Sequence, residues 1–426
     1  MRSIVGAKQC SSTLLVLAFL CSVAFGQGYG PDMHNVLGPA SGGMAGVSFA
    51  QPQDVPSAIF GNPSAMAQFL GTQFTLGTAW VEPIVRLEHD GAVTGTAFSD
   101  TSGTEGFLNP TVGVTQGLDQ LGVPVTIGIG FGGLSGAGAE FRGDPASLGT
   151  TSELLIYGLN VGAGARLTDR LSVGAALTLG MAIGESGLAE SSAMSHAYGL
   201  RGTLGLDYEV MPSTMLGAFY QTKMSFTLDD AVLASPPGTT PPIYQNLPFD
   251  EPDNIGLGIA NHSLMNGDLL IAVDILFKEW DNATFWQNVY DNQWAYAVGA
   301  QLTRGKMKYR LGYSYSDNPI RPNPIGTSPE AVLQYIQGAE LAAIWKHRLT
   351  GGVGLTDVLP GLDLDLFAGG LFPETDQFGA HTTATVAVWY TGIGLTWRFG
   401  TNGNKIETSS TDSDGAGWYE PKADSQ

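Results

Sequence analysis

The sequence predicts an all-β protein, a transmembrane antiparallel β-barrel of about 14 strands with an N-terminal hatch that plugs its lumen. Three observations lead to this fold class. Segments of about ten residues alternate between apolar and small or polar side chains, which is the pattern of membrane-spanning strands. The connections between these segments are short and long in turn, and an apolar, almost uncharged stretch precedes the first segment.

Composition narrows the class of protein. The chain has 426 residues, of which 59 are glycine and only 14% are charged, well below the ~25% of soluble domains. The formal net charge of −20 argues against nucleic acid as a partner, because a nucleic-acid-binding surface is basic. After the N-terminal region no apolar run approaches the ~18 residues of a spanning helix, so the chain is either soluble or a barrel.

Residues 1–26 are expected to be a secretory signal peptide. Arg2 and Lys8 supply positive charge, Leu14–Leu20 is an apolar core, and a small-x-small cleavage site ends at Gly26. Both cysteines lie inside this segment, so the exported chain is expected to be free of cysteine. An acidic, cysteine-free exported chain fits the bacterial envelope better than a disulfide-stapled secreted domain.

Residues 27–71 are expected to form the hatch. Within them, Gly38–Phe69 is rich in Gly, Ala, Ser and Pro and carries a single charge, Asp54. A flexible leader is the alternative, but the stretch holds more large apolar side chains than a solvated linker needs. Asn62 and Pro63 are expected to be the cap and the first residue of a short helix. The candidate gate residues are Met44, Phe49, Ile59, Phe60, Asn62, Pro63 and Met66.

Residues 72–399 are expected to form the barrel. In Lys306–Asp317, Met, Tyr and Leu occupy one face, and Lys, Arg, Gly and Ser occupy the other. A soluble β-sandwich alternates too, but it rarely fills its second face with Gly, Ser and Thr over so many strands. The expected strands are Thr72–Glu88, Thr111–Gly117, Val125–Gly133, Glu153–Leu167, Leu171–Gly184, Ser195–Val210, Thr214–Leu228, Pro252–His262, Asp268–Trp280, Asn292–Thr303, Met307–Ser316, Trp345–Leu355, Leu362–Gly370 and Thr385–Phe399.

The connections favour the barrel over the sandwich, because outer-membrane barrels have short turns on one rim and long loops on the other. The very short connections are 168–170, 211–213, 264–267 and 304–306. The long ones are 90–109, 134–152, 185–195, 229–251, 281–291 and 317–344, and the last of these holds a predicted helix after Ser328-Pro329. Residues 400–426 are polar and acidic and are expected to form a disordered periplasmic tail.

Several segments together resemble one known family. They are GPASGGMAGVSFA at Gly38–Ala50, NPSAM at Asn62–Met66, the first strand with Pro83, LSVGAALTLG at Leu171–Gly180, AVDILFKEWDNATFW at Ala272–Trp286 and YRLGYSYSDNPI at Tyr309–Ile320. In order and spacing they resemble the FadL/TodX family of outer-membrane transporters for long-chain fatty acids and hydrophobic compounds. The resemblance implies a barrel with a hatch in its lumen, substrate capture near the outer loops, and sideways exit through a gap at a kinked third strand.

The expected third strand contains IGIGFGG at Ile127–Gly133. Its final glycines break the alternation at a point where the backbone kinks or bulges most easily. The candidates for the lateral exit are therefore Gly130, Gly132 and Gly133.

The sequence contains no catalytic constellation, and neither an enzymatic activity nor a metal or cofactor is expected. The six histidines are scattered, without metal-ligand spacing. Asp363 and Asp365 alternate with leucine, so they are expected to line the lumen. Inward-facing basic residues are expected either to pair with such carboxylates or to hold the carboxylate of a substrate, and the candidates for the second role are Arg142 and Lys278.

The functional hypothesis is passive uptake of hydrophobic small molecules, long-chain fatty acids or hydrocarbons, by a monomeric barrel in outer-membrane lipid. Burial of about twelve methylenes at ~0.8 kcal/mol each contributes roughly 10 kcal/mol. One hydrogen bond to a charged head group adds about 1.5–3 kcal/mol, so an apolar pocket with a loose head-group preference is expected. The alternative is a structural or adhesive outer-membrane barrel whose long loops bind an external partner. A general diffusion porin is a third possibility, which the apolar hatch disfavours.

Overall fold

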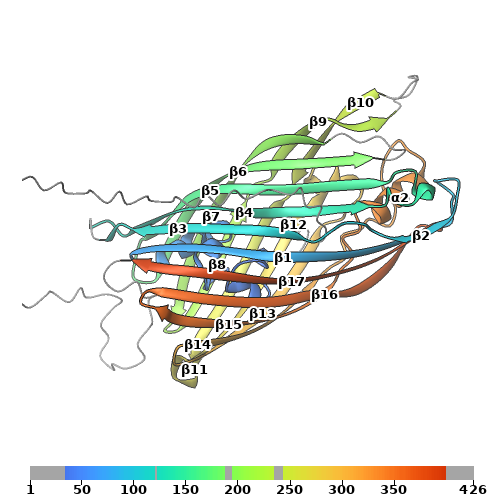
Figure 1. Cartoon of the computed structure of the whole chain (residues 1–426). Helices are drawn as coiled ribbons and strands as arrows, with labels where there is room; N and C mark the ends of the chain where they lie inside the picture. Colours follow the sequence, from blue (N-terminus) through green and yellow to red (C-terminus); the bar gives the residue numbers. More distant parts are fainter. Residues whose placement is uncertain (1–33, 120–121, 188–193, 235–242, 400–426) are drawn as a thin grey trace, which may run out of the picture.

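The computed structural model describes residues 34–119, 122–187, 194–234 and 243–399. Within these ranges, strands form one closed antiparallel barrel around a segment of coil and short helices (Figure 1). The predicted signal peptide, the first hatch residues (27–33) and the predicted tail lie outside the described residues. None of the helices in the described part of the chain has the length and hydropathy of a membrane span.

The barrel strands follow one another around the wall in chain order, and pairing between the first and the last closes the barrel. β1 pairs with β17 from Thr72 opposite Phe399 to His89 opposite Thr382. The prediction of a closed barrel of 14 antiparallel strands is confirmed. The strands are β1 (Thr72–His89), β3 (Phe107–Gly117), β4 (Val125–Glu140), β5 (Thr151–Arg166), β6 (Leu171–Gly187), β7 (Ser195–Met211), β8 (Thr214–Gln221), β11 (Asp253–Leu264), β12 (Leu269–Glu279), β13 (Gln293–Arg304), β14 (Met307–Ser316), β15 (His347–Leu359), β16 (Leu362–Phe378) and β17 (Thr382–Phe399).

One predicted strand proves to be two. The sequence predicts a single strand at Thr214–Leu228, but β8 ends at Gln221. The chain continues as β9 (Met224–Ala234), which pairs with β10 (Ile243–Glu251) in a separate two-stranded sheet. β9 packs over the inner face of β6 and β7, where glycines leave room for its side chains. A Cβ atom at Gly180, for example, would lie 2.5 Å from Met224 Sδ.

The predicted third and fourth strands are also longer at their loop ends than the sequence indicated. β4 continues beyond Gly133 to Glu140, and β5 begins at Thr151, so the loop between them is shorter than the predicted 134–152. β2 (Phe98–Thr101) lengthens the same rim by pairing with the end of β1.

Alternate residues of the wall face outward and inward as predicted. In β14, Tyr309 and Leu311 are 47% and 61% exposed, whereas Arg310 and Ser314 on the opposite face are 6% and 2% exposed. The outward face therefore presents apolar side chains to the surroundings, as a wall in contact with lipid requires. The inward face is small or polar.

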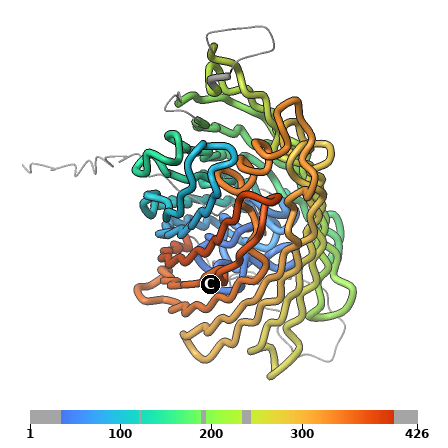
Figure 2. Tube along the Cα trace, turned by 90° about the vertical axis from the view of Figure 1, so that its right-hand side faces the viewer, coloured from blue at the N-terminus to red at the C-terminus, as the bar shows by residue number. Residues whose placement is uncertain are grey.

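Residues 34–70 lie inside the barrel (Figure 2). They form the short helices η1 (Ser41–Met44), α1 (Val55–Phe60) and η2 (Pro63–Gln68). Inward-facing glycines bring wall and hatch into contact, since a Cβ atom at Gly312 would overlap the backbone of Met44 and Ala45, and one at Gly128 would lie 2.5 Å from Met66 Sδ. Much of the glycine content of the inner face therefore makes room for the hatch.

The long loops gather at one rim of the barrel, where α2 (Glu330–Ala339) lies beside the ends of β16 and β17. Tyr335 of α2 is buried, shares a hydrogen bond of 2.8 Å with the hydroxyl of Thr150, and packs edge-on against His89. The predicted helix is confirmed, although no side chain caps its N-terminus. The other short helices are η4 (Pro145–Ser147), η5 (Met265–Gly267), η6 (Trp280–Asn282) and η7 (Trp286–Asn288).

Candidate functional site

The described part of the hatch, residues 34–71, is held together by its one carboxylate, Asp54. Asp54 is 2% exposed and caps α1 by accepting a hydrogen bond of 2.9 Å from the N–H of Ser57 through Oδ1. Its Oδ2 accepts from the N–H groups of Ala40 and Ser41 at 2.9 and 2.8 Å. One side chain therefore ties the start of α1 to the start of η1. The sequence marked Asp54 as the sole charge of the stretch without assigning this role.

Two carboxylates of the wall anchor the hatch to the barrel. Asp274 on β12 accepts hydrogen bonds from the N–H groups of Ser48 and Phe49 at 2.7 and 3.0 Å. Asp207 on β7 accepts from the side-chain amides of Asn62 and Gln68 at 2.7 and 3.2 Å. These hydrogen bonds tie both aspartates to the hatch.

The predicted gate residues are packed within the barrel. Asn62 caps η2 as predicted, accepting from the N–H of Ser64 at 3.2 Å, and Pro63 is the first residue of that helix. The helix is of the 3-10 type. Phe60 differs from the others because it is only partly buried and faces a cavity. The buried members of the set are Met44, Phe49, Ile59, Asn62, Pro63 and Met66.

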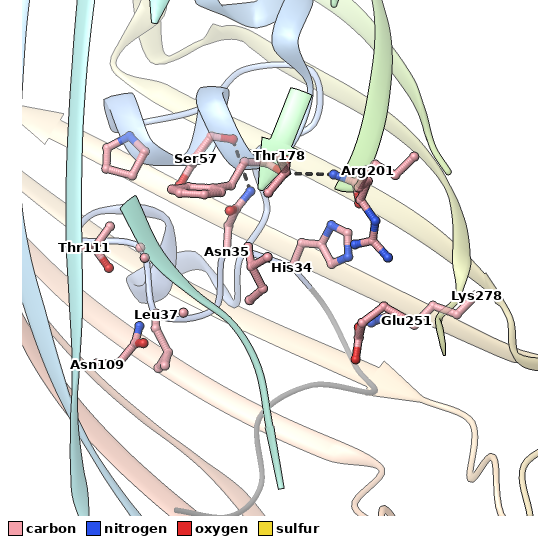
Figure 3. A pocket seen from close by; sticks show the side chains of 17 residues that line it. His34, Asn35, Leu37, Ser57, Asn109, Thr111, Thr178, Arg201, Glu251 and Lys278 are labelled. Carbon is pink, nitrogen blue, oxygen red and sulfur yellow. Dashed lines mark hydrogen bonds between the residues drawn. The ribbon is translucent and has the colours of Figure 1, made fainter. Parts of the chain in front are cut away.

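A cavity of about 790 Å³, part of it open to solvent, lies between the hatch and the wall (Figure 3). On the hatch side it is lined by Leu37, Pro56 and Phe60, among others. On the wall side it reaches β3 and β4, where the lining residues are Asn109, Thr111, Gly132, Gly133 and Leu134. Where the cavity meets these two strands, its lining combines the apolar side chain of Leu134 and two glycines with the polar side chains of Asn109 and Thr111.

The opposite side of the same cavity is charged. Arg201, Glu251 and Lys278 lie there together, away from Asn109 and Thr111 (Figure 3). All three charged residues are at most 6% exposed. The guanidinium of Arg201 donates to the carbonyls of residues 222 and 252 at 2.7 and 2.9 Å. Lys278, a predicted head-group ligand, therefore lines the cavity next to a second cation.

The ladder between β3 and β4 stops partway along the wall. Its last pair toward the loop rim is Thr111 with Gly132, although β4 continues to Glu140 in pairing with β5 alone. In the β4–β5 ladder, Gly133 and Ser135 are opposite consecutive residues of β5, so Leu134 is a bulge. The next residue of β3, Pro110, has no N–H to donate to a ladder.

The irregularity lies close to the predicted kink. Gly132 is the last residue of β4 that pairs with β3, and Gly133, which pairs with Tyr157 of β5, immediately precedes the bulge. Gly130, by contrast, is regularly paired on both sides, and a Cβ atom there would lie 3.1 Å from Ile59 and from Phe60. Gly130 therefore allows close approach of the hatch and does not bend the strand.

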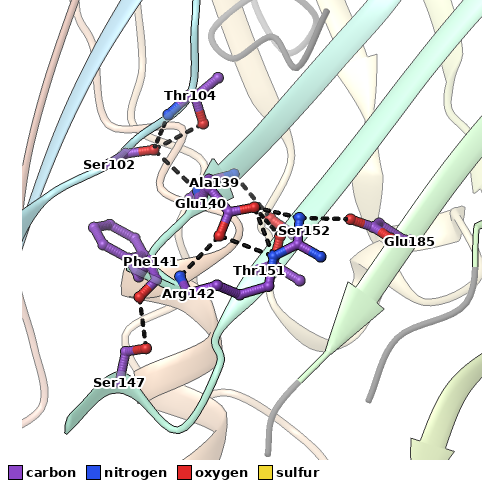
Figure 4. Close-up of polar contacts among 10 residues, drawn as sticks. All are labelled: Ser102, Thr104, Ala139, Glu140, Phe141, Arg142, Ser147, Thr151, Ser152 and Glu185. Atoms are coloured by element: carbon purple, nitrogen blue, oxygen red, sulfur yellow. Dashed lines mark hydrogen bonds and ion pairs between the residues drawn. The ribbon is translucent and has the colours of Figure 1, made fainter. Parts of the chain in front are cut away.

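Arg142, the other predicted head-group ligand, does not line this cavity. Its Nε donates to both carboxylate oxygens of Glu140 at 2.9 and 2.7 Å, and its Nη2 lies 3.5 Å from a carboxylate oxygen of Glu185 (Figure 4). Two carboxylates thus surround its charge. Arg142 is therefore a poor candidate for a substrate carboxylate.

Two further inward-facing cations form the expected ion pairs. Arg310 pairs with Asp365 at 2.5 Å, and Arg398 pairs with Asp363 at 2.9 Å. The second contact joins the neighbouring strands β17 and β16, and the first reaches from β14 across β15 to β16 on the inner face of the wall. Within the described ranges, no group of three or more His, Cys, Asp or Glu side chains has the arrangement of a metal site.

The sequence matches no family model and no curated protein. Solved structures do match. The Pseudomonas putida toluene transporter TodX is 18% identical with a TM-score of 0.64, and the match covers 86% of this chain and 99% of TodX. The Ralstonia pickettii toluene transporter TbuX is also 18% identical, with a TM-score of 0.63 and coverage of 85% and 98%. A Pseudomonas aeruginosa FadL homologue is 16% identical, with a TM-score of 0.65 and coverage of 88% and 100%. The chain has the fold of these barrels.

Proposed function

We propose that this protein is a member of the FadL/TodX family and takes up hydrophobic small molecules passively across the bacterial outer membrane. The likeness to TodX and TbuX, both described as toluene transporters, supports the class of substrate. The observation that carries the proposal is the cavity between hatch and wall, because it extends, with Phe60 and Leu134 in its lining, to the place where β3 and β4 stop pairing.

In the proposed route the substrate enters at the long-loop rim, rests in this cavity, and leaves sideways between β3 and β4. The hatch closes the direct way to the short-turn rim, which faces the periplasm. Transfer of an apolar molecule from the cavity into periplasmic water would cost about 0.8 kcal/mol of free energy per methylene. Exit into lipid avoids this cost, so a break in the wall beside the cavity suits a hydrophobic cargo.

The charged side of the cavity extends the substrate range to fatty acids. Lys278 and Arg201 would hold the carboxylate, and the tail would lie along Phe60 toward Leu134. A charged hydrogen bond contributes about 1.5–3 kcal/mol, less than the burial of a long tail, so hydrocarbons without a head group also bind. We propose that the barrel acts as a monomer, exported by its signal peptide.

The Leu134 bulge offers a direct test of the lateral exit. Deletion of Leu134 would leave Gly133 and Ser135 adjacent in the chain, already opposite Tyr157 and Ile156 of β5, so the register is preserved. The straightened β4 should pair further with β3 and narrow the exit. The matched control, Leu134→Ala, removes the side chain and keeps the extra residue.

The measurement is the binding of toluene and decanoate to protein in lipid nanodiscs, followed by their transfer into the surrounding lipid. We expect the deletion to bind both ligands normally but to release them to lipid at least tenfold more slowly, with Leu134→Ala close to wild type. Normal release by a correctly assembled deletion variant would contradict the lateral exit. A wild-type protein that binds neither ligand would favour the structural or adhesive barrel.

A further inference from the structure

The break between β3 and β4 is closed at its loop end. On the side of the short turns it begins after the pair of Thr111 with Gly132. On the loop side, the N–H of Gly103 donates to the carbonyl of Glu140 at 2.7 Å. The N–H of Glu140 donates to the hydroxyl of Ser102 at 3.0 Å. These two hydrogen bonds join the end of β4 to the chain between β2 and β3, so the interval without β3–β4 pairing is bounded at both ends.

The same chain segment also reaches β1. The N–H of Ser102 donates to the carbonyl of Val85 at 2.7 Å, which continues the ladder of β1 with β2. β3 pairs with β1 only on the turn side of this point. Ser102 therefore links β1 to β4 directly, past the loop end of the break. The contacts of Ser102 and Gly103 with Val85 and Glu140 are called the crosspiece below.

Arg142 fixes the β4 end of the crosspiece (Figure 4). Its Nε donates to both carboxylate oxygens of Glu140 at 2.9 and 2.7 Å, and its backbone N–H donates to one of them at 2.8 Å. The hydroxyl of Thr151 on β5 donates to the same carboxylate at 3.4 Å. The N–H of Ala139 donates to the hydroxyl of Ser152, also on β5, at 3.2 Å. The end of β4 is thus held from the β5 side as well as from the β1 side.

The edge of β4 along the break carries little side chain. Residues 133–139 read Gly-Leu-Ser-Gly-Ala-Gly-Ala, so Leu134 is the one side chain there larger than serine. At ~3.3 Å per residue the stretch is roughly 25 Å long, more than a small hydrophobic molecule needs. Width is therefore the limiting dimension. Because the edge is almost bare, the width depends on how far the backbones of β3 and β4 separate, and strands tied at both ends of an interval separate less than strands tied at one.

We propose that the crosspiece sets the upper limit on the width of the cargo that leaves sideways between β3 and β4. The inference rests on the proposed lateral exit and adds selection by shape to it. Flexible chains and single rings fit a break that is closed at both ends, whereas planar molecules of several fused rings require β3 and β4 to move apart. Ser102 and Gly103 are positioning residues, because they act through the backbone of β4 and do not line the cavity between hatch and wall.

The experiment measures uptake by bacterial cells that lack a transporter of this class and carry the full-length protein, relative to cells with an empty vector. Toluene is one ring wide, and pyrene is planar with four fused rings. Ser102→Ala removes the hydroxyl that accepts from the N–H of Glu140, and Gly103→Pro removes the N–H that donates to its carbonyl.

Each variant has a matched control. Ser147→Ala removes a hydroxyl that donates to the carbonyl of Phe141, within the loop after β4 and away from the crosspiece. Gly103→Ala keeps the N–H, and its Cβ would lie 3.6 Å from Glu140, an ordinary contact. Heat-resistant electrophoretic mobility confirms that each variant forms the barrel. A further pair of variants combines Ser102→Ala and Gly103→Pro with the deletion of Leu134, which is designed to narrow the break itself.

We expect Ser102→Ala and Gly103→Pro each to speed pyrene uptake about tenfold and to leave toluene uptake within about twofold of wild type. The two controls should change neither rate, and the deletion of Leu134 should abolish the gain. Equal gains for both cargoes, a gain that survives the deletion, or no gain in assembled variants would overturn the proposal. A wild type that takes up pyrene as fast as toluene would overturn this inference alone. No uptake of toluene by the wild type would overturn the uptake function as well.

Discussion

The anchorage of the hatch at Asp274 gives a prediction whose size follows from the structure. The carboxylate accepts two backbone hydrogen bonds, from Ser48 at 2.7 Å and from Phe49 at 3.0 Å, and both donors are buried. Asp274→Ala removes the acceptor and leaves both N–H groups without it. At about 1.5–3 kcal/mol for each hydrogen bond to a charged acceptor, docking of this part of the hatch should weaken by roughly 3–6 kcal/mol.

This loss is large enough to measure as gating. Because every ~1.4 kcal/mol changes an equilibrium constant tenfold, the ratio of docked to undocked hatch should fall by roughly 10²–10⁴-fold. In planar bilayers we expect Asp274→Ala to show frequent brief openings where the wild type is almost silent. Asp274→Asn keeps one acceptor oxygen and should show about a tenfold smaller effect than the alanine variant.

The assembly of the barrel serves as the control, because Asp274 belongs to β12. Heat-resistant mobility should be retained in both variants, since no ladder hydrogen bond is removed. An alanine variant that assembles normally and stays as silent as wild type, while a hatch deletion conducts, would refute the assignment of Asp274 as an anchor.

Three further predictions concern the wall, the hatch and the outer loops. Leu311→Arg, on the exposed face of β14, should cost about 2–4 kcal/mol in unfolding free energy if it lies near the membrane midplane, and a smaller loss in denaturant titrations would place it at an interface. Gly312→Val should displace η1 and expose it to protease, whereas Gly351→Val, where the nearest atom to a Cβ is 3.7 Å away, should not; equal cleavage would contradict the packing. Because the pKa of Glu340 is raised to about 8 from an ordinary 4.5, the buried carboxyl keeps its proton, so docking of residues 330–345 should weaken as pH rises from about 4.5 to 8. Hydrogen-exchange protection there, taken relative to the intrinsic exchange rate at each pH, should fall over that window in wild type and stay constant in Glu340→Gln.

The barrel could be predicted because the alternation of side chains is a local property of the chain. Each spanning strand contributes its own period, and the strand count follows without knowledge of the partners. The break after Gln221 could not be found in this way, since β9 continues as a strand and differs from β8 only in what it pairs with. The sequence of a single strand does not show which distant strand it pairs with.

The site could be predicted only in part for the same reason. The apolar hatch and Lys278 were found because their residue types are unusual for their positions. The bulge at Leu134 follows two glycines. Because glycine has no side chain, the sequence there does not show that the inward–outward alternation shifts by one residue. The partner of Arg142 at Glu185 is 43 residues away, and only the fold shows that the arginine is neutralised.

The central claim is that the N-terminal segment is a hatch that closes the lumen. Deletion of residues 27–61 removes η1 and α1 and leaves every barrel strand intact, so a heat-resistant barrel should still form. Single-channel recording in planar bilayers compares this deletion with the full-length protein at equal reconstitution. The full-length protein should show little steady conductance, and the deletion should show a large one. Equal conductance from the two proteins would contradict the claim, because the segment would then not obstruct the lumen.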